Sequence, residues 1–219
     1  MYTNALFQAV NQAESNTVLD PVFIKSSAQP KDFPPDRGME VAVVGRSNSG
    51  KSSAVNALAG VRKLARTSKT PGRTQLINFF GVAEERRIVD LPGYGFARVP
   101  PAVRAKWREF IEAYFAQRES LVGLIVTMDI RRELSELDRT MLNFASDLSL
   151  ETLVLLTKAD KLSRGAGLSA QARVRKELAG FGEVMVFSGL KGQGVDAARR
   201  HLTDWLQITE PAARRQGAE

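Results

Sequence analysis

One eight-residue stretch constrains the fold of this chain more than any other part of the sequence. Residues 45–52 read Gly-Arg-Ser-Asn-Ser-Gly-Lys-Ser and match G-x-x-x-x-G-K-[ST] at every fixed position. An apolar run at 40–44 precedes this stretch, and a helix is expected from about Lys51 to Ala59, closed by Gly60. A strand, a glycine-rich turn and a helix in this order form a phosphate-binding loop, because inward N–H groups and the helix N-terminus both favour anions.

This loop predicts a nucleotide bound with Mg²⁺. We expect Lys51 to bridge the β and γ phosphates and the Ser52 hydroxyl to ligate the metal ion. The predicted phosphate-binding residues are Gly45, Arg46, Ser47, Asn48, Ser49, Gly50, Lys51 and Ser52.

The rest of the chain alternates between strand and helix patterns. Short apolar runs predict strands at 76–81, 86–91, 121–129, 152–157 and 184–187, while helical spacing predicts helices at about 103–118, 134–147, 169–179 and 195–207. The stretch 121–129 is apolar throughout, as in a strand buried on both faces of a parallel sheet. We therefore predict an α/β fold with a mainly parallel sheet and helices on both faces.

A second motif, Asp90-Leu91-Pro92-Gly93, follows the apolar strand residues Ile88 and Val89, about 40 residues after the phosphate loop. The aspartate can hold a Mg²⁺-bound water, and Gly93 can offer its N–H to the γ-phosphate. Between the two motifs lies Thr70-Pro71-Gly72-Arg73-Thr74, where GTPases place a threonine that ligates Mg²⁺ only when the γ-phosphate is present. We favour Thr74, with Thr70 as the lesser candidate.

A third motif points to guanine. Thr157-Lys158-Ala159-Asp160 fits [NT]-K-x-D at the end of a strand. The Asp160 carboxylate can accept hydrogen bonds from N1–H and the exocyclic amine of guanine, a pair of donors that adenine lacks on that edge. Phe187-Ser188-Gly189 ends the last strand, where GTPases close the base pocket. Together these motifs predict a three-layer P-loop GTPase (Ras-like) fold and disfavour an ATPase or kinase.

The amino-acid sequences of these loops resemble those of one family. The stretches GRSNSGKSS, KTPGRTQLINFF, DLPGYGFA, TKADKL and FSGLKGQG are similar to those of the EngB (YihA/YsxC) family, which belongs to the TrmE-Era-EngA-EngB-like P-loop GTPases. The resemblance runs from about Val22 to Leu206. Gly189 departs from it, because a second small polar residue is expected there.

The resemblance implies a role in assembling the large ribosomal subunit, with linked effects on cell division and septation. Position by position, it implies that Ser52 and Thr74 bind Mg²⁺ and that Lys51, Thr74 and Gly93 serve catalysis. The residues it adds or repeats on the phosphate side are Gly72, Arg73, Thr74, Gln75, Leu76, Asp90, Leu91, Pro92 and Gly93, and those around guanine are Thr157, Lys158, Ala159, Asp160, Phe187, Ser188 and Gly189.

Two residues bear on the rate of hydrolysis. Tyr94 stands where signalling GTPases carry a glutamine that orients the attacking water, so slow intrinsic hydrolysis is expected. Asn48 stands where potassium-dependent GTPases similar to this one hold K⁺ near the β–γ bridge, and the alternative is that Asn48 only shapes the loop.

Charge bears on the partner. The chain carries a net charge of +7, and residues 41–83 hold seven bases and no acid, which favours a polyanionic partner such as rRNA. The competing hypothesis is a signalling switch that binds only proteins at the division site. The absence of cysteine, of a signal-like N-terminus and of a long apolar run leads us to expect a cytoplasmic protein without a membrane partner. We also expect a monomer. We expect flexible ends at 1–21 and 208–219 around a GTPase domain at 22–207.

Overall fold

In the computed structural model of the protein, residues 19, 21–65, 76–95 and 101–208 are described, without the side chains of residues 101–104. The strands are β1 (Val22–Ser27), β2 (Met39–Gly45), β3 (Ile77–Ala83), β4 (Arg86–Asp90), β5 (Leu121–Asp129), β6 (Glu151–Thr157) and β7 (Glu183–Val186). The helices are α2 (Lys51–Leu58), α3 (Pro101–Gln117), α4 (Glu136–Asp147), α5 (Arg164–Glu177) and α6 (Val195–Trp205), with short 3-10 helices η1 (Pro30–Asp32) and η2 (Ala159–Lys161).

The strands of the described part form one sheet in the order β1-β3-β4-β2-β5-β6-β7. Neighbours from β4 to β7 are parallel, whereas β3 runs antiparallel to both β4 and β1. The sheet is therefore mainly parallel, and the predicted α/β fold is confirmed.

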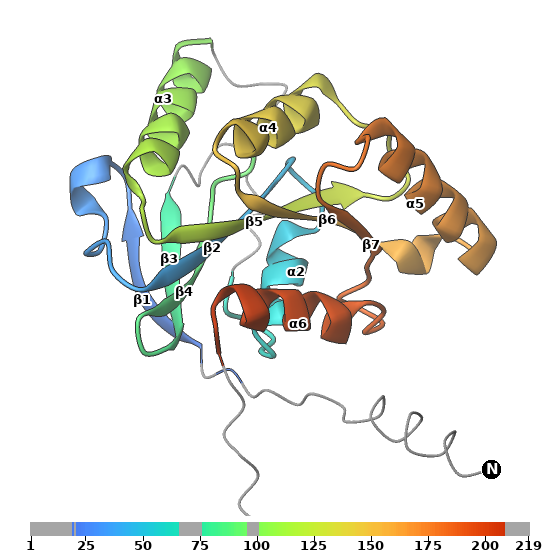
Figure 1. Ribbon diagram of the computed structural model, residues 1–219, viewed down its shortest axis with the longest axis horizontal. Helices are drawn as coiled ribbons and strands as arrows, with labels where there is room; N and C mark the ends of the chain where they lie inside the picture. Colours follow the sequence, from blue (N-terminus) through green and yellow to red (C-terminus); the bar gives the residue numbers. More distant parts are fainter. Residues whose placement is uncertain (1–18, 20, 66–75, 96–100, 209–219) are drawn as a thin grey trace, which may run out of the picture.

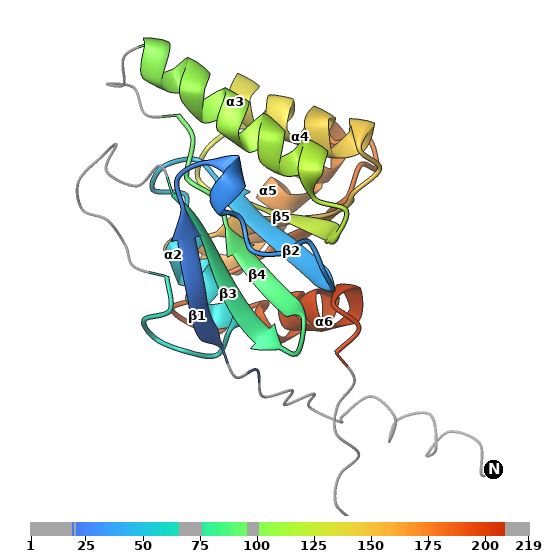
Figure 2. The ribbon, with the colours of Figure 1, turned by 90° about the vertical axis from the view of Figure 1, so that its left-hand side faces the viewer.

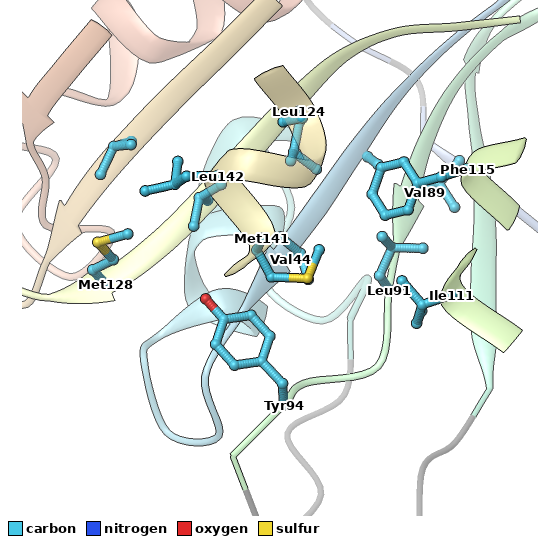
Figure 3. Close-up of a cluster of buried hydrophobic side chains, with 14 of the residues drawn as sticks. Val44, Val89, Leu91, Tyr94, Ile111, Phe115, Leu124, Met128, Met141 and Leu142 are labelled. Atoms are coloured by element: carbon cyan, nitrogen blue, oxygen red, sulfur yellow. The ribbon is translucent and has the colours of Figure 1, made fainter. Parts of the chain in front are cut away.

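Helices cover both faces of this sheet (Figures 1 and 2). Alternate residues of β2 explain the two cores, since Val41 and Val43 pack with α2 and α6 while Ala42 and Val44 pack with α3, α4 and α5. The middle strands are buried on both sides, which is why their sequences are continuously apolar rather than alternating. Figure 3 shows part of the core under α3 and α4.

The segment before β2 is more ordered than its prolines and polar residues indicate. Val22–Ser27 forms an edge strand, and a buried ion cluster holds the turn that follows it. Glu40, fully buried, accepts from Arg87 Nη1 at 2.9 Å and pairs with Arg118. The same two guanidinium groups donate to carbonyls of the turn, Arg118 to Pro34 at 2.8 Å and Arg87 to Arg37 at 2.9 Å. The turn is therefore fastened to the amino end of the sheet.

One helix begins earlier than predicted. α5 begins at Arg164 instead of about 169, because the Ser163 side chain accepts a hydrogen bond from the N–H of Ala166 and caps the helix. Gly165 and Gly167 weaken the helical signal of the first turn. The other helices and strands start and end within a few residues of their expected positions.

In the described region, no helix has the length and apolar character required to cross a bilayer.

Candidate functional site

The phosphate loop lies at the carboxyl end of β2, between this strand and α2. Both of its outer glycines are required by close contacts. A Cβ on Gly45 would collide with Thr127 Oγ1, and Gly50, with φ of +93°, would place a Cβ 3.1 Å from Thr157 Oγ1. Inside the loop, Ser49 Oγ and Thr127 Oγ1 share a hydrogen bond of 2.7 Å. The loop is therefore built tightly onto β5 and β6.

Lys51, the first residue of α2, forms an ion pair with Asp90 at the end of β4. Both side chains are largely buried, and Asn78 Nδ2 lies 3.4 Å from the other carboxylate oxygen of Asp90. Ser52 follows directly on the helix. The structure thus brings the predicted phosphate lysine, the hydroxyl residue next to it and the aspartate of the second motif to one place.

The second motif is joined to the phosphate loop through backbone. The N–H of Tyr94 donates to the carbonyl of Gly45 at 3.2 Å, and the N–H of Ser47 donates to the carbonyl of Tyr94 at 2.8 Å. A Cβ on Gly93 would lie 3.2 Å from the Gly45 carbonyl oxygen, so this position favours glycine. Leu91 and Pro92 are buried beneath it. The side chain of Tyr94 is buried, and its hydroxyl donates to Asp138 of α4.

The base-reading motif is also fastened to the phosphate loop. Thr157 Oγ1 contacts the carbonyl of Ser49 and lies 3.0 Å from that of Met128. Lys158 has a left-handed backbone, with φ of 58°, and its ammonium donates to the carbonyl of Asn48 at 2.5 Å. Asn48 itself has φ of 64°, a conformation that asparagine tolerates better than most residues.

Sequence reasoning missed Asp129, the last residue of β5. Its carboxylate accepts from Lys158 Nζ at 3.0 Å and from Arg131 at 2.9 and 2.7 Å. The hydrogen bonds from Arg131, and then those from Lys158, hold the pKa of Asp129 well below its usual range. Asp129 is thus ionised and fixes the ammonium group of Lys158. Its position at the carboxyl end of a buried strand was the available signal.

Asp160 and Ser188 meet across two loops. Ser188 Oγ donates to Asp160 Oδ1 at 2.7 Å, and this bond, together with nearby Lys161, lowers the pKa of Asp160. The N–H of Ala159 donates to the carbonyl of Phe187 at 3.1 Å. A Cβ on Gly189 would lie 2.9 Å from the carbonyl of Ser53 on α2, which explains the glycine at the position that departs from the resemblance.

Part of the predicted site lies outside the described residues, namely Gly72, Arg73, Thr74 and Gln75, together with the alternative Thr70. Leu76 is described and lies half-buried just before β3. The other predicted residues gather at the carboxyl edge of the sheet, where ligands bind in open α/β folds.

This chain is similar in sequence to known GTP-binding proteins. Residues 40–158 match the family described as "50S ribosome-binding GTPase". The chain is 51% identical over 193 residues to "Probable GTP-binding protein EngB" of Enterobacter sp. (strain 638), covering 87% of this chain and 93% of the relative. It is 50% identical over 200 residues to the protein of the same name from Escherichia coli (strain K12 / MC4100 / BW2952), covering 90% and 95%.

Solved structures share the fold. A crystal structure of a probable GTP-binding protein engB aligns with a TM-score of 0.63 at 20% identity, covering 78% of this chain and all of that one. The structure of a variant of Aquifex aeolicus Era bound to GDP.AlF4- aligns with a TM-score of 0.62 at 23% identity, covering 79% and 58%. From the motifs, the fold and the identity to curated relatives, the chain belongs to the EngB family of GTP-binding proteins, GTPases of the P-loop class.

Proposed function

We propose that this chain is a Mg²⁺-dependent GTPase that acts as a nucleotide switch in the assembly of the large ribosomal subunit, with linked effects on cell division and septation. The observation that carries the GTPase part is the joining of the motif loops: the second motif and the base-reading motif are each hydrogen-bonded to the phosphate loop. The ribosomal part is supported by the family match, whose description names 50S ribosome binding.

On the phosphate side, residues 45–52, 72–76 and 90–93 would contact the nucleotide. The buried hydroxyl of Ser47 has no hydrogen-bond partner among the described residues, and a phosphate oxygen would supply one. Hydroxyl and carboxylate oxygens are ligands that Mg²⁺ prefers, so the Ser52 hydroxyl would ligate the metal ion and Asp90 would hold a water bound to it. Thr74 would complete the metal site. The metal ion would neutralise charge on the β and γ phosphates.

On the base side, the carboxylate of Asp160 would accept two hydrogen bonds from guanine, and Ser188 orients it. The stem of Lys158 would pack over the base while Asp129 and the carbonyl of Asn48 hold its ammonium. Residues Phe187–Gly189 would close the pocket with backbone N–H groups. An adenine would leave the carboxylate without donors, which costs binding free energy and makes the site selective for guanine.

In hydrolysis, water would attack the γ-phosphorus as the bond to the β–γ bridging oxygen breaks. The products are inorganic phosphate, which takes the oxygen of the water, a released proton, and GDP, on whose bridging oxygen negative charge develops. Lys51, Thr74 and Gly93 would stabilise that charge. The Tyr94 phenol is buried and donates to Asp138, so it is not available to orient a water molecule, which supports slow intrinsic hydrolysis. K⁺ held by Asn48 would add charge at the bridge, and equal rates in Na⁺ and K⁺ would instead favour a loop-shaping role for Asn48.

The partner and the boundaries complete this proposal. A net charge of +7 suits contacts with rRNA phosphates. We propose a cytoplasmic monomer, without a membrane partner, whose GTPase domain spans 22–207, with flexible extensions at 1–21 and 208–219. Most residues of these two extensions lie outside the described part of the structure.

The test is co-sedimentation with purified large ribosomal subunits over a salt series, comparing a non-hydrolysable GTP analogue with GDP. The proposal predicts binding with the analogue, loss with GDP and weakening as salt rises, because phosphate contacts release counterions. Binding in neither state would leave the GTPase chemistry intact and favour the alternative, a signalling switch that binds only proteins at the division site.

A further inference from the structure

The side chain of Tyr94 runs from the second motif into the core below α4. The residue is 2% exposed, and Figure 3 shows its side chain in the cluster that contains Met141 of α4. The phenol hydroxyl donates to Asp138 Oδ1 at 2.6 Å. Burial, and then the neighbouring Asp138 carboxylate, raise the pKa of Tyr94 far above its usual range. The phenol therefore stays protonated and remains a donor.

Asp138 lies in the first turn of α4 and also caps the start of this helix. Its Oδ2 accepts from the backbone N–H of Ser135 at 2.8 Å, and its own N–H donates to Ser135 Oγ at 3.3 Å, which together form the capping box that starts the helix. The Ser135 hydroxyl also donates to Asp138 Oδ2 at 2.6 Å. Asp138 is 5% exposed, and no ion pair to its carboxylate occurs among the described residues. Its carboxylate is satisfied by hydrogen bonds from Tyr94 and Ser135, and the bond from Tyr94 is not part of the cap.

The backbone of the same tyrosine is bound to the phosphate loop. Its N–H and carbonyl make the two hydrogen bonds to Gly45 and Ser47 described above. Gly93 precedes it and touches the same loop. Residue 94 is thus held on one side by the phosphate loop and on the other by α4, so Gly93 cannot shift far unless the bond between Tyr94 and Asp138 breaks or α4 moves with it.

We propose that Asp138 is a positioning residue for γ-phosphate recognition, holding the Gly93–Tyr94 peptide in place through the Tyr94 hydroxyl. The proposal rests on the proposed function, in which the Gly93 N–H meets the γ-phosphate. Since GDP has no γ-phosphate, its binding gains nothing from this clamp. This clamp, formed by Asp138 and Tyr94, therefore favours the binding of GTP over that of GDP. Through it, the position of α4 is coupled to which nucleotide is bound.

The test is Tyr94→Phe, which removes the hydroxyl and leaves the capping box intact. Dissociation constants for a non-hydrolysable GTP analogue and for GDP are measured by titration calorimetry on the full chain. We expect the analogue to bind more weakly by about fivefold or more, the lower end of typical coupling factors, and the GDP constant to change less than about twofold. Asp138→Asn should act in the same direction, and the double variant should lose less than the two single effects combined, because both changes act on the same hydrogen bond.

Tyr114→Phe is the matched control. The Tyr114 hydroxyl also donates to a buried carboxylate, Glu40 Oε2 at 3.1 Å, in the same core but at the amino end of the sheet. Tyr114→Phe should lower the stability of the fold and leave the ratio of the dissociation constants for the GTP analogue and GDP unchanged. Equal weakening of both nucleotides in Tyr94→Phe, or no weakening of either, would overturn the clamp. A wild-type chain that binds neither nucleotide would refute the proposed function itself.

Discussion

The hydroxyl of Thr157 offers a single-atom test of how the base-reading and phosphate loops are joined. The residue is 2% exposed, and its Oγ1 contacts the carbonyls of Ser49 and Met128. Thr157→Val keeps the shape of the side chain and replaces only the hydroxyl with a methyl group. The substitution therefore isolates the hydrogen bond between the two loops.

The expected loss of unfolding free energy follows from the acceptor that Thr157→Val leaves without a donor. No other donor to the Ser49 carbonyl occurs among the described residues, so valine leaves a buried acceptor without a partner. Such a group costs about 1–3 kcal/mol. Taking about 2 kcal/mol and a urea m-value of about 2 kcal/mol/M, the unfolding midpoint should fall by about 1 M.

The assay is urea unfolding followed by tryptophan fluorescence, together with the GDP dissociation constant. We expect GDP to bind several-fold more weakly, because Ser49 lies in the phosphate loop. Thr203→Val is the control: its hydroxyl is also buried but donates to the carbonyl of Arg200 within α6, at 3.0 Å. The control should leave GDP binding unchanged. A Thr157→Val midpoint and GDP affinity equal to wild type would refute the reasoning.

Two further outcomes are expected. Glu40→Gln leaves Arg87 and Arg118 without their buried counter-charge, which should destabilise the fold by about 3–5 kcal/mol. The Tm measured by calorimetry should therefore fall by roughly 10 °C. An unchanged Tm would contradict the stabilising role of this ion cluster. Because Arg131 lowers the pKa of Asp129 in the folded state, this group contributes stability above about pH 4 that is lost as pH falls further. Asp129→Asn should flatten that acid-side loss in a pH series of unfolding free energies, and an equally steep loss would argue against it.

Local signals predicted most of the fold. The apolar runs of β2, β5 and β6 and the proline at the start of α3 place these elements within a few residues of the structure. Such signals depend on neighbours in the chain, so they need no knowledge of tertiary contacts. The start of α5 was predicted too far along the chain, at about residue 169. Gly165 and Gly167 weaken the helical pattern of the first turn, which the cap at Ser163 stabilises.

The site was predicted less completely, because its supports come from distant parts of the chain. The motif residues could be named from spacing, but the partner of Tyr94 is Asp138, on a helix 44 residues away. Likewise, Asp129 holds Lys158 from another strand. A sequence shows that Tyr94 replaces a glutamine, yet only the packing of α4 against the sheet shows that its side chain is buried.

The central claim is that the loops at the carboxyl edge of the sheet bind guanine nucleotides through Asp160. The most direct measurement is the dissociation constant of GDP and of xanthosine diphosphate for wild type and Asp160→Asn, with Asp196→Asn on the exposed side of α6 as the control. We predict that Asp160→Asn weakens GDP by about 100-fold or more and binds xanthosine diphosphate better than GDP, while the control behaves as wild type. Unchanged GDP affinity in Asp160→Asn would contradict the account.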